Sequence, residues 1–376
     1  MSYRSTLSRA YWLLLCLLAT SLFFSFGFGP PSFIESDGAQ SPVLASQLQV
    51  LRQSPPPDFH GKAALVMDET GRVVFQRNAN ARLAPASLTK IMTAVVALDN
   101  GDLNSKITIK WQHTEIGSTM GLAPGDIVGL EDLLWGLLLP SGNDAAKAIA
   151  DLVGGTQERF VDMMNAKAAD LGMKNTKFGN PHGLDADGHY SSAYDLAVLT
   201  RYAFQYPLFA RMVSTTRHEV RVGNRTLYLV NANGLLTKQM TPGSDGVKTG
   251  YTENAGDSLI SSINQDGHRF FVVVMGTQSR DSESLPIINY IRNNFQWVKP
   301  PRPLYAAFTD VQGQDRELKW DPPAFLIPRW QRFDLAVVAD LQKHSNPYTP
   351  ETKIGALTYY LGKQPIQQVP LYVKNP

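Results

Sequence analysis

The chain has 376 residues, of which 43% are hydrophobic and 18% charged. This is the composition of an ordinary globular protein with room for two folded units, so intrinsic disorder is not expected. The 35 basic and 33 acidic residues give a net charge of +2 and form no basic stripe, which argues against a general nucleic-acid-binding protein.

The amino terminus has the pattern of an export signal. Arg4 and Arg9 precede an uncharged run over residues 11–28, which Gly29 and two prolines follow. The run is longer than a typical cleavable signal core of about 7–15 residues and shorter than a full span of about 20. Residues 1–29 are therefore either a signal peptide or a retained signal anchor, and the rest of the chain is exported.

The only cysteine, Cys16, lies inside this apolar run. The remainder of the chain therefore has no thiol, which excludes disulfide bonds, a cysteine nucleophile and a zinc–cysteine site there. Residues 30–58 are rich in Pro, Ser and Gln and are predicted to be a flexible tether.

Residues 59–297 carry the pattern of a mixed α+β domain. Hydrophobic periodicity and turn residues predict a strand hairpin over 63–76, helices over 87–100, 130–139, 144–153, 156–171 and 192–204, two more hairpins over 218–230 and 258–275, and a helix over 282–295. The sheet would combine strands from both ends of this domain. Residues 298–303 are a proline-rich linker, and 304–376 are predicted to be a small β-rich domain.

The first chemical cluster is Ser87-Leu88-Thr89-Lys90, at the start of the predicted helix. Residues three apart share one helix face, so Lys90 can reach Ser87, and the free N–H groups of the first turn point toward whatever Ser87 attacks. Lys90 can act as a base near neutral pH only if burial or a nearby positive charge lowers its pKa. An isolated match of this kind is usually a capping serine followed by a surface lysine.

Two further clusters support the first. Ser141-Gly142-Asn143 lies in a tight connection between two helices, where a hydroxyl can relay a proton and a carboxamide can bind a peptide carbonyl. Lys248-Thr249-Gly250 is predicted on an edge strand, where it offers an ammonium and a hydroxyl to a carboxylate, and Gly250 lets a substrate backbone approach. Each would be an ordinary turn on its own; together they are typical of a serine acyl-transfer enzyme.

The three clusters and their surroundings resemble the penicillin-binding D-alanyl-D-alanine carboxypeptidases. The segments 86–93, 138–145, 180–184 and 245–252 carry the resemblance, which covers roughly residues 59 to 297; the tail resembles the family's β-rich carboxy-terminal domain. It implies a penicillin-binding/β-lactamase-like fold, with an antiparallel sheet, helices on both of its faces and a helical part.

The resemblance also implies roles for single residues. Ser87 would be the nucleophile, Lys90 its base and Ser141 a proton relay, while Asn143 would position the peptide. Lys248 and Thr249 would hold the terminal carboxylate, with Gly250 beside them and Arg280 as a helper, and backbone N–H groups of Ser87 and Tyr251 would bind the oxyanion. His182 would line the cleft or be structural.

The expected activity is removal of the terminal D-alanine from peptidoglycan stem peptides, with β-lactams as covalent inhibitors and no cofactor or metal. Three alternatives remain open: a D,D-endopeptidase that uses the same residues, a β-lactamase, and a non-catalytic wall-binding scaffold. A β-lactamase is disfavoured because no Glu-x-x-Leu-Asn lies between Asn143 and Lys248. The enzyme would act in the periplasm or on the outer face of the cytoplasmic membrane, bound to that membrane if the amino-terminal segment is uncleaved.

Overall fold

The computed structural model describes residues 55–300, 307–309, 315–341 and 352–374. The predicted export signal, most of the tether and part of the linker lie outside these residues. Within the described residues, no helix has the length and apolar character needed to cross a membrane.

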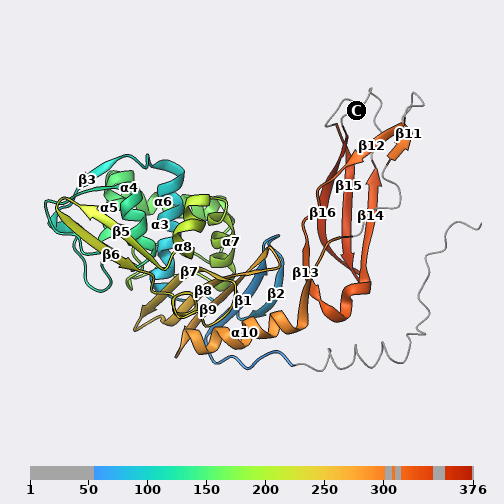
Figure 1. Cartoon of the computed structure of the whole chain (residues 1–376), viewed down its shortest axis with the longest axis horizontal. Helices are drawn as coiled ribbons and strands as arrows, with labels where there is room; N and C mark the ends of the chain where they lie inside the picture. Colours follow the sequence, from blue (N-terminus) through green and yellow to red (C-terminus); the bar gives the residue numbers. More distant parts are fainter. Residues whose placement is uncertain (1–54, 301–306, 310–314, 342–351, 375–376) are drawn as a thin grey trace, which may run out of the picture. The chain divides into compact units, whose positions relative to one another are not determined.

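The centre of the fold is a five-stranded antiparallel sheet (Figure 1). Its strands, in spatial order, are β2 (Val73–Arg77), β1 (Ala63–Asp68), β9 (His268–Thr277), β8 (Gly256–Gln265) and β7 (Ser244–Thr252). The pairing of β1 with β9 joins the two ends of the domain, as the sequence predicted. Strand β7 pairs only with β8 among the described strands, so it forms an edge of the sheet.

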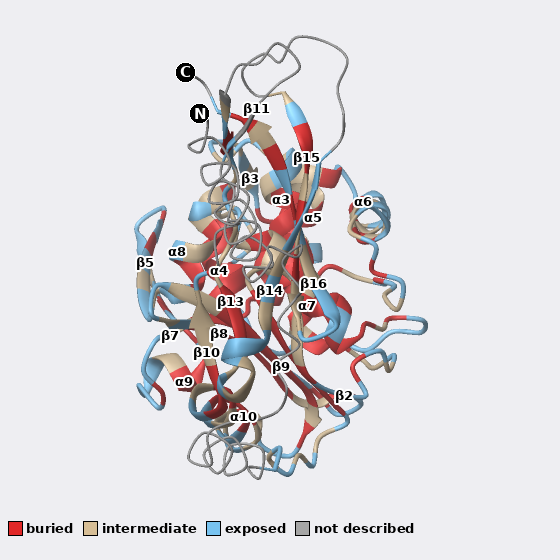
Figure 2. Cartoon of the chain, turned by 90° about the vertical axis from the view of Figure 1, so that its right-hand side faces the viewer, coloured by how far each residue is buried: buried red, intermediate tan, exposed pale blue. Residues whose placement is uncertain are grey.

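Both faces of the sheet are buried, which the alternation of side chains explains. Leu65 and Val273 belong to one hydrophobic cluster and their neighbours Val66 and Val272 to another. The first cluster includes the helical part of the domain; the second includes α10 (Arg280–Asn294). Buried residues accordingly run along the strands in Figure 2. This confirms the predicted sheet with helices on both faces.

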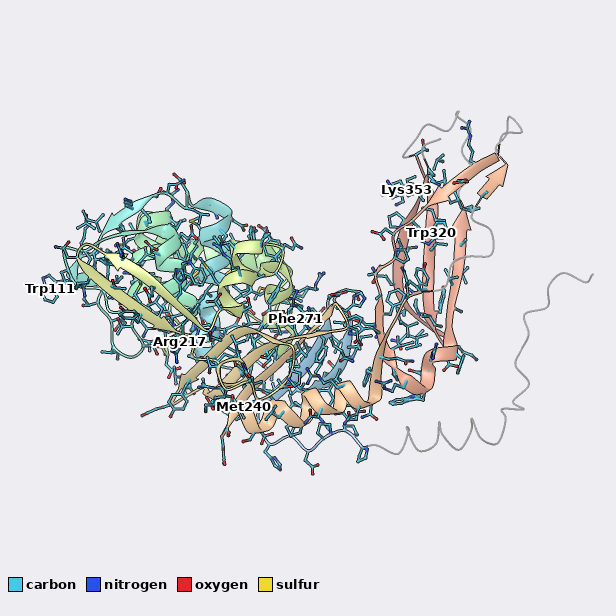
Figure 3. All side chains as sticks on the ribbon, viewed as in Figure 1. Trp111, Arg217, Met240, Phe271, Trp320 and Lys353 are labelled. Atoms are coloured by element: carbon cyan, nitrogen blue, oxygen red, sulfur yellow. The ribbon has the colours of Figure 1, made fainter. Side chains whose placement is uncertain are left out.

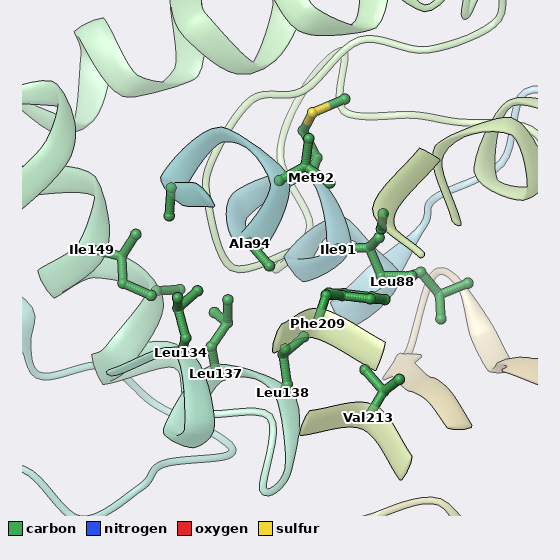
Figure 4. Packing of buried hydrophobic residues seen from close by; sticks show 14 of the residues in the cluster. Leu88, Ile91, Met92, Ala94, Leu134, Leu137, Leu138, Ile149, Phe209 and Val213 are labelled. Atoms are coloured by element: carbon green, nitrogen blue, oxygen red, sulfur yellow. The ribbon is translucent and has the colours of Figure 1, made fainter. Parts of the chain in front are cut away.

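The helical part surrounds α3 (Lys90–Asn100), in which every residue from Lys90 to Ala97 is buried. Around it lie α4 (Leu130–Leu138), α5 (Asn143–Gly154), α6 (Gln157–Asp170), α7 (Ala193–Ala203) and α8 (Pro207–Ser214), with a short helix, α9 (Gly234–Thr237), before β7. Phe271 of β9 packs on Phe204, at a ring-centroid distance of 5.1 Å (Figure 3). Figure 4 shows Ile91 of α3 among leucines of α4 and Phe209 of α8.

Some local predictions differ from the structure. The hairpin of β5 (Arg217–Val222) and β6 (Arg225–Val230) forms a two-stranded sheet of its own and does not join the central sheet. It packs on the helical part, where the ring of His218 stacks on that of Trp135 in α4 with the ring centroids 3.7 Å apart. A second small sheet, β3 (Lys106–Thr108) with β4 (Ile127–Gly129), and the turn η2 (Trp111–His113) were not predicted.

The described residues of the carboxy-terminal part form β-strands and one 3-10 turn, as the predicted β-rich domain requires. Strand β10 (Phe295–Val298) follows α10 and pairs with β13 (Phe325–Pro328). A five-stranded sheet then contains β11 (Ala307–Thr309), β12 (Asp315–Lys319), β16 (Gln364–Val373), β15 (Lys353–Leu361) and β14 (Leu335–Leu341). The turn η3 (Arg329–Asp334) lies between β13 and β14.

Candidate active site

Ser87 lies in a 3-10 turn, η1 (Ala86–Thr89), and the α-helix proper begins at Lys90. The prediction placed Ser87 in the first α-helical turn. Ala86 has a φ of +48°, which L-residues rarely adopt, and this reverses the chain immediately before Ser87. Strained backbone of this kind concentrates at functional sites because the surrounding packing must hold it in place.

Lys90 is completely buried beside Ser87. Its Nζ lies 2.8 Å from Ser87 Oγ, 2.7 Å from Asn143 Oδ1 and 2.6 Å from the carbonyl oxygen of His182. A neutral amine has two N–H donors and one lone pair, so it can donate to the last two oxygens and accept the hydroxyl proton of Ser87. The three contacts therefore suit a neutral Lys90, and they also suit the ammonium that forms when it takes this proton.

The electrostatic surroundings favour the neutral form. Burial lowers the pKa of Lys90 well below its usual value, and the positive charge of Lys248 lowers it further, while Asp144 acts in the opposite direction. Lys248 is itself buried, and burial followed by the charge of Arg280 lowers the pKa of Lys248 to about 7. Burial and a nearby positive charge, the two conditions under which the sequence allowed Lys90 to act as a base, thus both act on Lys90.

Ser141-Gly142-Asn143 forms the connection from α4 to α5. Ser141 has a φ of +68°, and its buried Oγ has no hydrogen-bond partner among the described residues. Asn143 accepts from Lys90 through Oδ1 and donates through Nδ2 to the carbonyl of Ile116, at 2.5 Å. Both ends of this carboxamide are engaged within the protein, whereas the Ser141 hydroxyl remains available.

Asp144, which sequence reasoning missed, fixes the loop that faces this connection. Its buried carboxylate accepts the N–H groups of Met120 at 3.0 Å and Leu122 at 3.1 Å, and it also accepts from Gly121 and Thr119. A carboxylate directly after Ser-Gly-Asn, in the first turn of a helix, was the signal that could have identified it.

Strand β7 brings the third cluster against the nucleophile turn. A Cβ atom at Gly250 would lie 3.2 Å from Ser87 N and 3.2 Å from Ala86 Cβ, so the absence of a side chain permits this approach. Lys248 Nζ donates to the carbonyl of Thr249 at 3.0 Å, and both side chains are buried, whereas Tyr251 is exposed.

The loop from Gly179 to His189 closes the site from another direction. A Cβ atom at Gly183, where φ is +94°, would lie 2.0 Å from the Ala86 carbonyl oxygen. Thr93 Oγ1 donates to the carbonyl of Pro181 at 2.5 Å, in addition to the contact of Lys90 with His182. Nucleophile turn, β7 and this loop therefore meet at the backbone of Ser87.

Comparisons with known proteins agree with this arrangement. The family model described as D-alanyl-D-alanine carboxypeptidase, Peptidase_S11, matches residues 49–279. The chain belongs to this family.

Similar proteins include the D-alanyl-D-alanine carboxypeptidase DacF of Bacillus subtilis, which is 36% identical over 287 residues, 74% of this chain and 69% of that protein. DacC of Escherichia coli is 32% identical over 346 residues, 84% of each chain. The solved structure of penicillin binding protein 5 from Haemophilus influenzae superimposes with a TM-score of 0.70 at 28% identity, covering 85% of this chain and 98% of that chain. These relatives confirm the family resemblance and the fold class.

In this carboxypeptidase, two histidines of the loop over 179–189 form hydrogen bonds within the loop and with the residues that follow Ser87. His182 contributes its carbonyl oxygen to Lys90, while its ring Nδ1 accepts from Leu184 N at 3.2 Å; burial and Lys90 lower the pKa of His182 to about 4. His189, missed from the sequence, accepts the Gly179 N–H at Nδ1, which leaves Nε2–H to donate to Thr89 Oγ1 at 2.9 Å.

Arg280, the expected helper for the carboxylate, is engaged within the protein. Its guanidinium forms an ion pair with Asp257 at 2.7 Å, and its backbone N–H donates to the same carboxylate at 3.0 Å. Its positive charge also contributes to the lowered pKa of Lys248.

Proposed function

We propose that this serine-type D-alanyl-D-alanine carboxypeptidase releases the terminal D-alanine of peptidoglycan stem peptides through an acyl-enzyme on Ser87. The single observation that carries the proposal is the buried Lys90 amine, 2.8 Å from Ser87 Oγ and with its pKa strongly lowered by burial. A serine hydroxyl becomes an effective nucleophile when an adjacent base accepts its proton.

In the acylation step, Ser87 Oγ attacks the carbonyl carbon between the two D-alanines, and its proton moves to Lys90. The negative oxygen that develops is held by the backbone N–H groups of Ser87 and Tyr251. Collapse of the tetrahedral intermediate breaks the C–N bond, and the leaving amine takes a proton from Lys90 through the Ser141 hydroxyl. The lack of another partner for Ser141 Oγ supports this relay.

Substrate recognition depends on the carboxylate of the terminal D-alanine. Lys248 and Thr249 hold it on β7, and the charge of the carboxylate favours the protonated form of Lys248, whose pKa burial lowers to about 7. Asn143 first holds Lys90 and then positions the peptide. Water hydrolyses the acyl-enzyme, whereas a β-lactam leaves its leaving group tethered and blocks that water.

We further propose that the enzyme works outside the cytoplasm, in the periplasm or on the outer face of the cytoplasmic membrane. The amino-terminal run over residues 11–28 supports export. Sequencing the amino terminus of the mature protein distinguishes a cleaved signal peptide from a retained signal anchor. A start beyond Gly27 indicates cleavage, and an intact amino terminus indicates a retained anchor.

The decisive experiment for the activity incubates the protein with benzylpenicillin and measures its intact mass. We expect a one-to-one adduct on the wild type and none on Ser87→Ala. Absence of an adduct on the wild type, or its persistence on the variant, would refute the assignment of Ser87. Offering a pentapeptide and a cross-linked dimer at equal concentration then compares carboxypeptidase with endopeptidase activity.

A further inference from the structure

A second candidate site lies away from the three clusters. A cavity of about 490 Å³ opens where the β1–β2 and β8–β9 turns meet the paired strands β10 and β13. Since Val298 pairs with Phe325, the residues just beyond each strand end, Lys299 and Ala324, lie on neighbouring walls. Its volume is within the range of small-molecule sites, and no residue of the proposed catalytic machinery lines it.

Two aromatic rings form one wall of the cavity. The rings of Trp297 and His268 are tilted against each other, with their centroids 4.9 Å apart and an interplanar angle of 30°. Glu69 holds His268 in place, because its carboxylate contacts His268 Nδ1 at 2.8 Å and accepts the Arg269 N–H at 2.9 Å. Two consecutive prolines, Pro322 and Pro323, extend the nonpolar surface.

The polar groups of the cavity require a ligand that both donates and accepts hydrogen bonds. Trp297 Nε1 has no acceptor among the described residues and is covered by neighbouring atoms, so a ligand oxygen reaches this donor only after the indole turns toward the cavity that Trp297 lines. Lys299 is a second donor. The carboxylates of Glu69 and Asp266 accept hydrogen bonds, and two negative groups against one lysine disfavour an anionic ligand.

We propose that this cavity binds a neutral, N-acetylated saccharide. Sugar hydroxyls donate to carboxylates and accept from the indole and ammonium N–H groups, and the C–H face of a pyranose ring packs on an aromatic wall. A stem peptide fits less well, because its terminal carboxylate would face Glu69 and Asp266. The choice of N-acetylated sugars rests on the proposed function, since the glycan strands of peptidoglycan consist of them; the stacking and hydrogen-bonding argument does not depend on it.

The test is calorimetric titration of the full-length protein, in detergent, with a tetrasaccharide of N-acetylglucosamine. Saturable binding is expected, weakened about tenfold by Trp297→Leu through loss of the stacking surface. Trp297→Phe keeps an aromatic ring but removes the N–H and is expected to weaken binding roughly threefold. The matched control is Trp111→Leu, because Trp111 is 79% exposed and projects from the surface outside this cavity (Figure 3).

Each variant is also assayed for penicillin adduct formation, which is expected to remain unchanged because the cavity lies outside the catalytic site. Absence of the penicillin adduct on the wild type, with intact sugar binding, would refute the proposed function alone. The saccharide proposal is overturned if the wild type does not bind the tetrasaccharide, if Trp111→Leu weakens binding as much as Trp297→Leu, or if a free pentapeptide binds in a Trp297-dependent manner while the sugar does not.

Discussion

The approach of Gly183 to the nucleophile turn gives a quantitative test of how Ser87 is positioned. A Cβ atom added at Gly183 would lie 2.0 Å from the Ala86 carbonyl oxygen and 3.0 Å from Ser87 N. A carbon and a carbonyl oxygen normally approach no closer than about 3.3 Å, so Gly183→Ala must separate the two backbones by roughly 1.3 Å. Neither side of this contact is the end of a flexible side chain that could rotate away.

A displacement of this size at the nucleophile is expected to reduce the rate of acylation about 100-fold. The φ of +94° at Gly183 adds a separate cost, because alanine in this region loses about 1–2 kcal/mol of folding free energy. Acylation is measured as the second-order rate constant with a fluorescent penicillin, and stability by urea denaturation.

Gly188→Ala is the matched control. Gly188 lies in the same loop with a φ of +72°, but the nearest atom to its added Cβ is Lys177 Nζ at 3.8 Å. Both variants should therefore lose the stability that alanine at a positive φ costs, Gly183→Ala should lose more because of its backbone contact, and only Gly183→Ala should acylate slowly. The reasoning is refuted if Gly183→Ala acylates within about threefold of the wild type, or if both variants slow equally.

Three further substitutions test the electrostatics and the buried network. Lys248→Gln removes a positive charge that lowers the pKa of Lys90, so the rise of the acylation rate with pH should move to higher pH. His189→Leu leaves two buried polar groups without a partner and should cost about 1–3 kcal/mol at pH 7. Burial lowers the pKa of His189 from its usual value of 6.5 to about 4, so its contribution is complete above about pH 6.5 and is lost as the pH falls toward 4. The stability of the variant should therefore fall less over this window. Asp144→Asn exchanges one acceptor oxygen for a donor and should destabilise the fold by about 1–3 kcal/mol while slowing acylation.

Each of these substitutions has a comparison that isolates its cause. Lys248→Arg keeps the charge, and an equal pH shift in that variant would contradict the electrostatic explanation. His189→Gln keeps a donor for Thr89 and should be more stable than His189→Leu; equal losses would argue against the hydrogen bond. Asp162→Asn, at an exposed position of α6, should change stability by less than about 0.5 kcal/mol.

The central sheet was predictable because its signals are local. The turn after β1 and the apolar runs of β1, β8 and β9 all follow from neighbouring residues. The hairpin over 217–230 could be predicted only in part. Its pattern predicts two paired strands, but the surface on which the hairpin packs depends on the stacking of His218 on Trp135, a contact between residues far apart in the sequence.

The same distinction holds at the candidate site. Ser87 and Lys90 are three residues apart, so their contact could be predicted from helical geometry, even though the turn is 3-10. The acceptor role of the His182 carbonyl could not be, because a backbone oxygen leaves no mark in the sequence. Asp144 was overlooked for a different reason, since its backbone partners are N–H groups of a loop 22 to 24 residues away.

The position of η1 against β7 has a consequence for solubility. A buried apolar surface that loses its cover promotes association between chains. The turn that carries Ser87 packs on the face of β7 at Gly250, because the Cβ position of a strand residue points out of the sheet plane. Substitutions that unfold residues 86–89 should thus expose Leu88 and the sheet face beneath it, so a nucleophile-turn variant that is recovered mainly in inclusion bodies reports an uncovered sheet face.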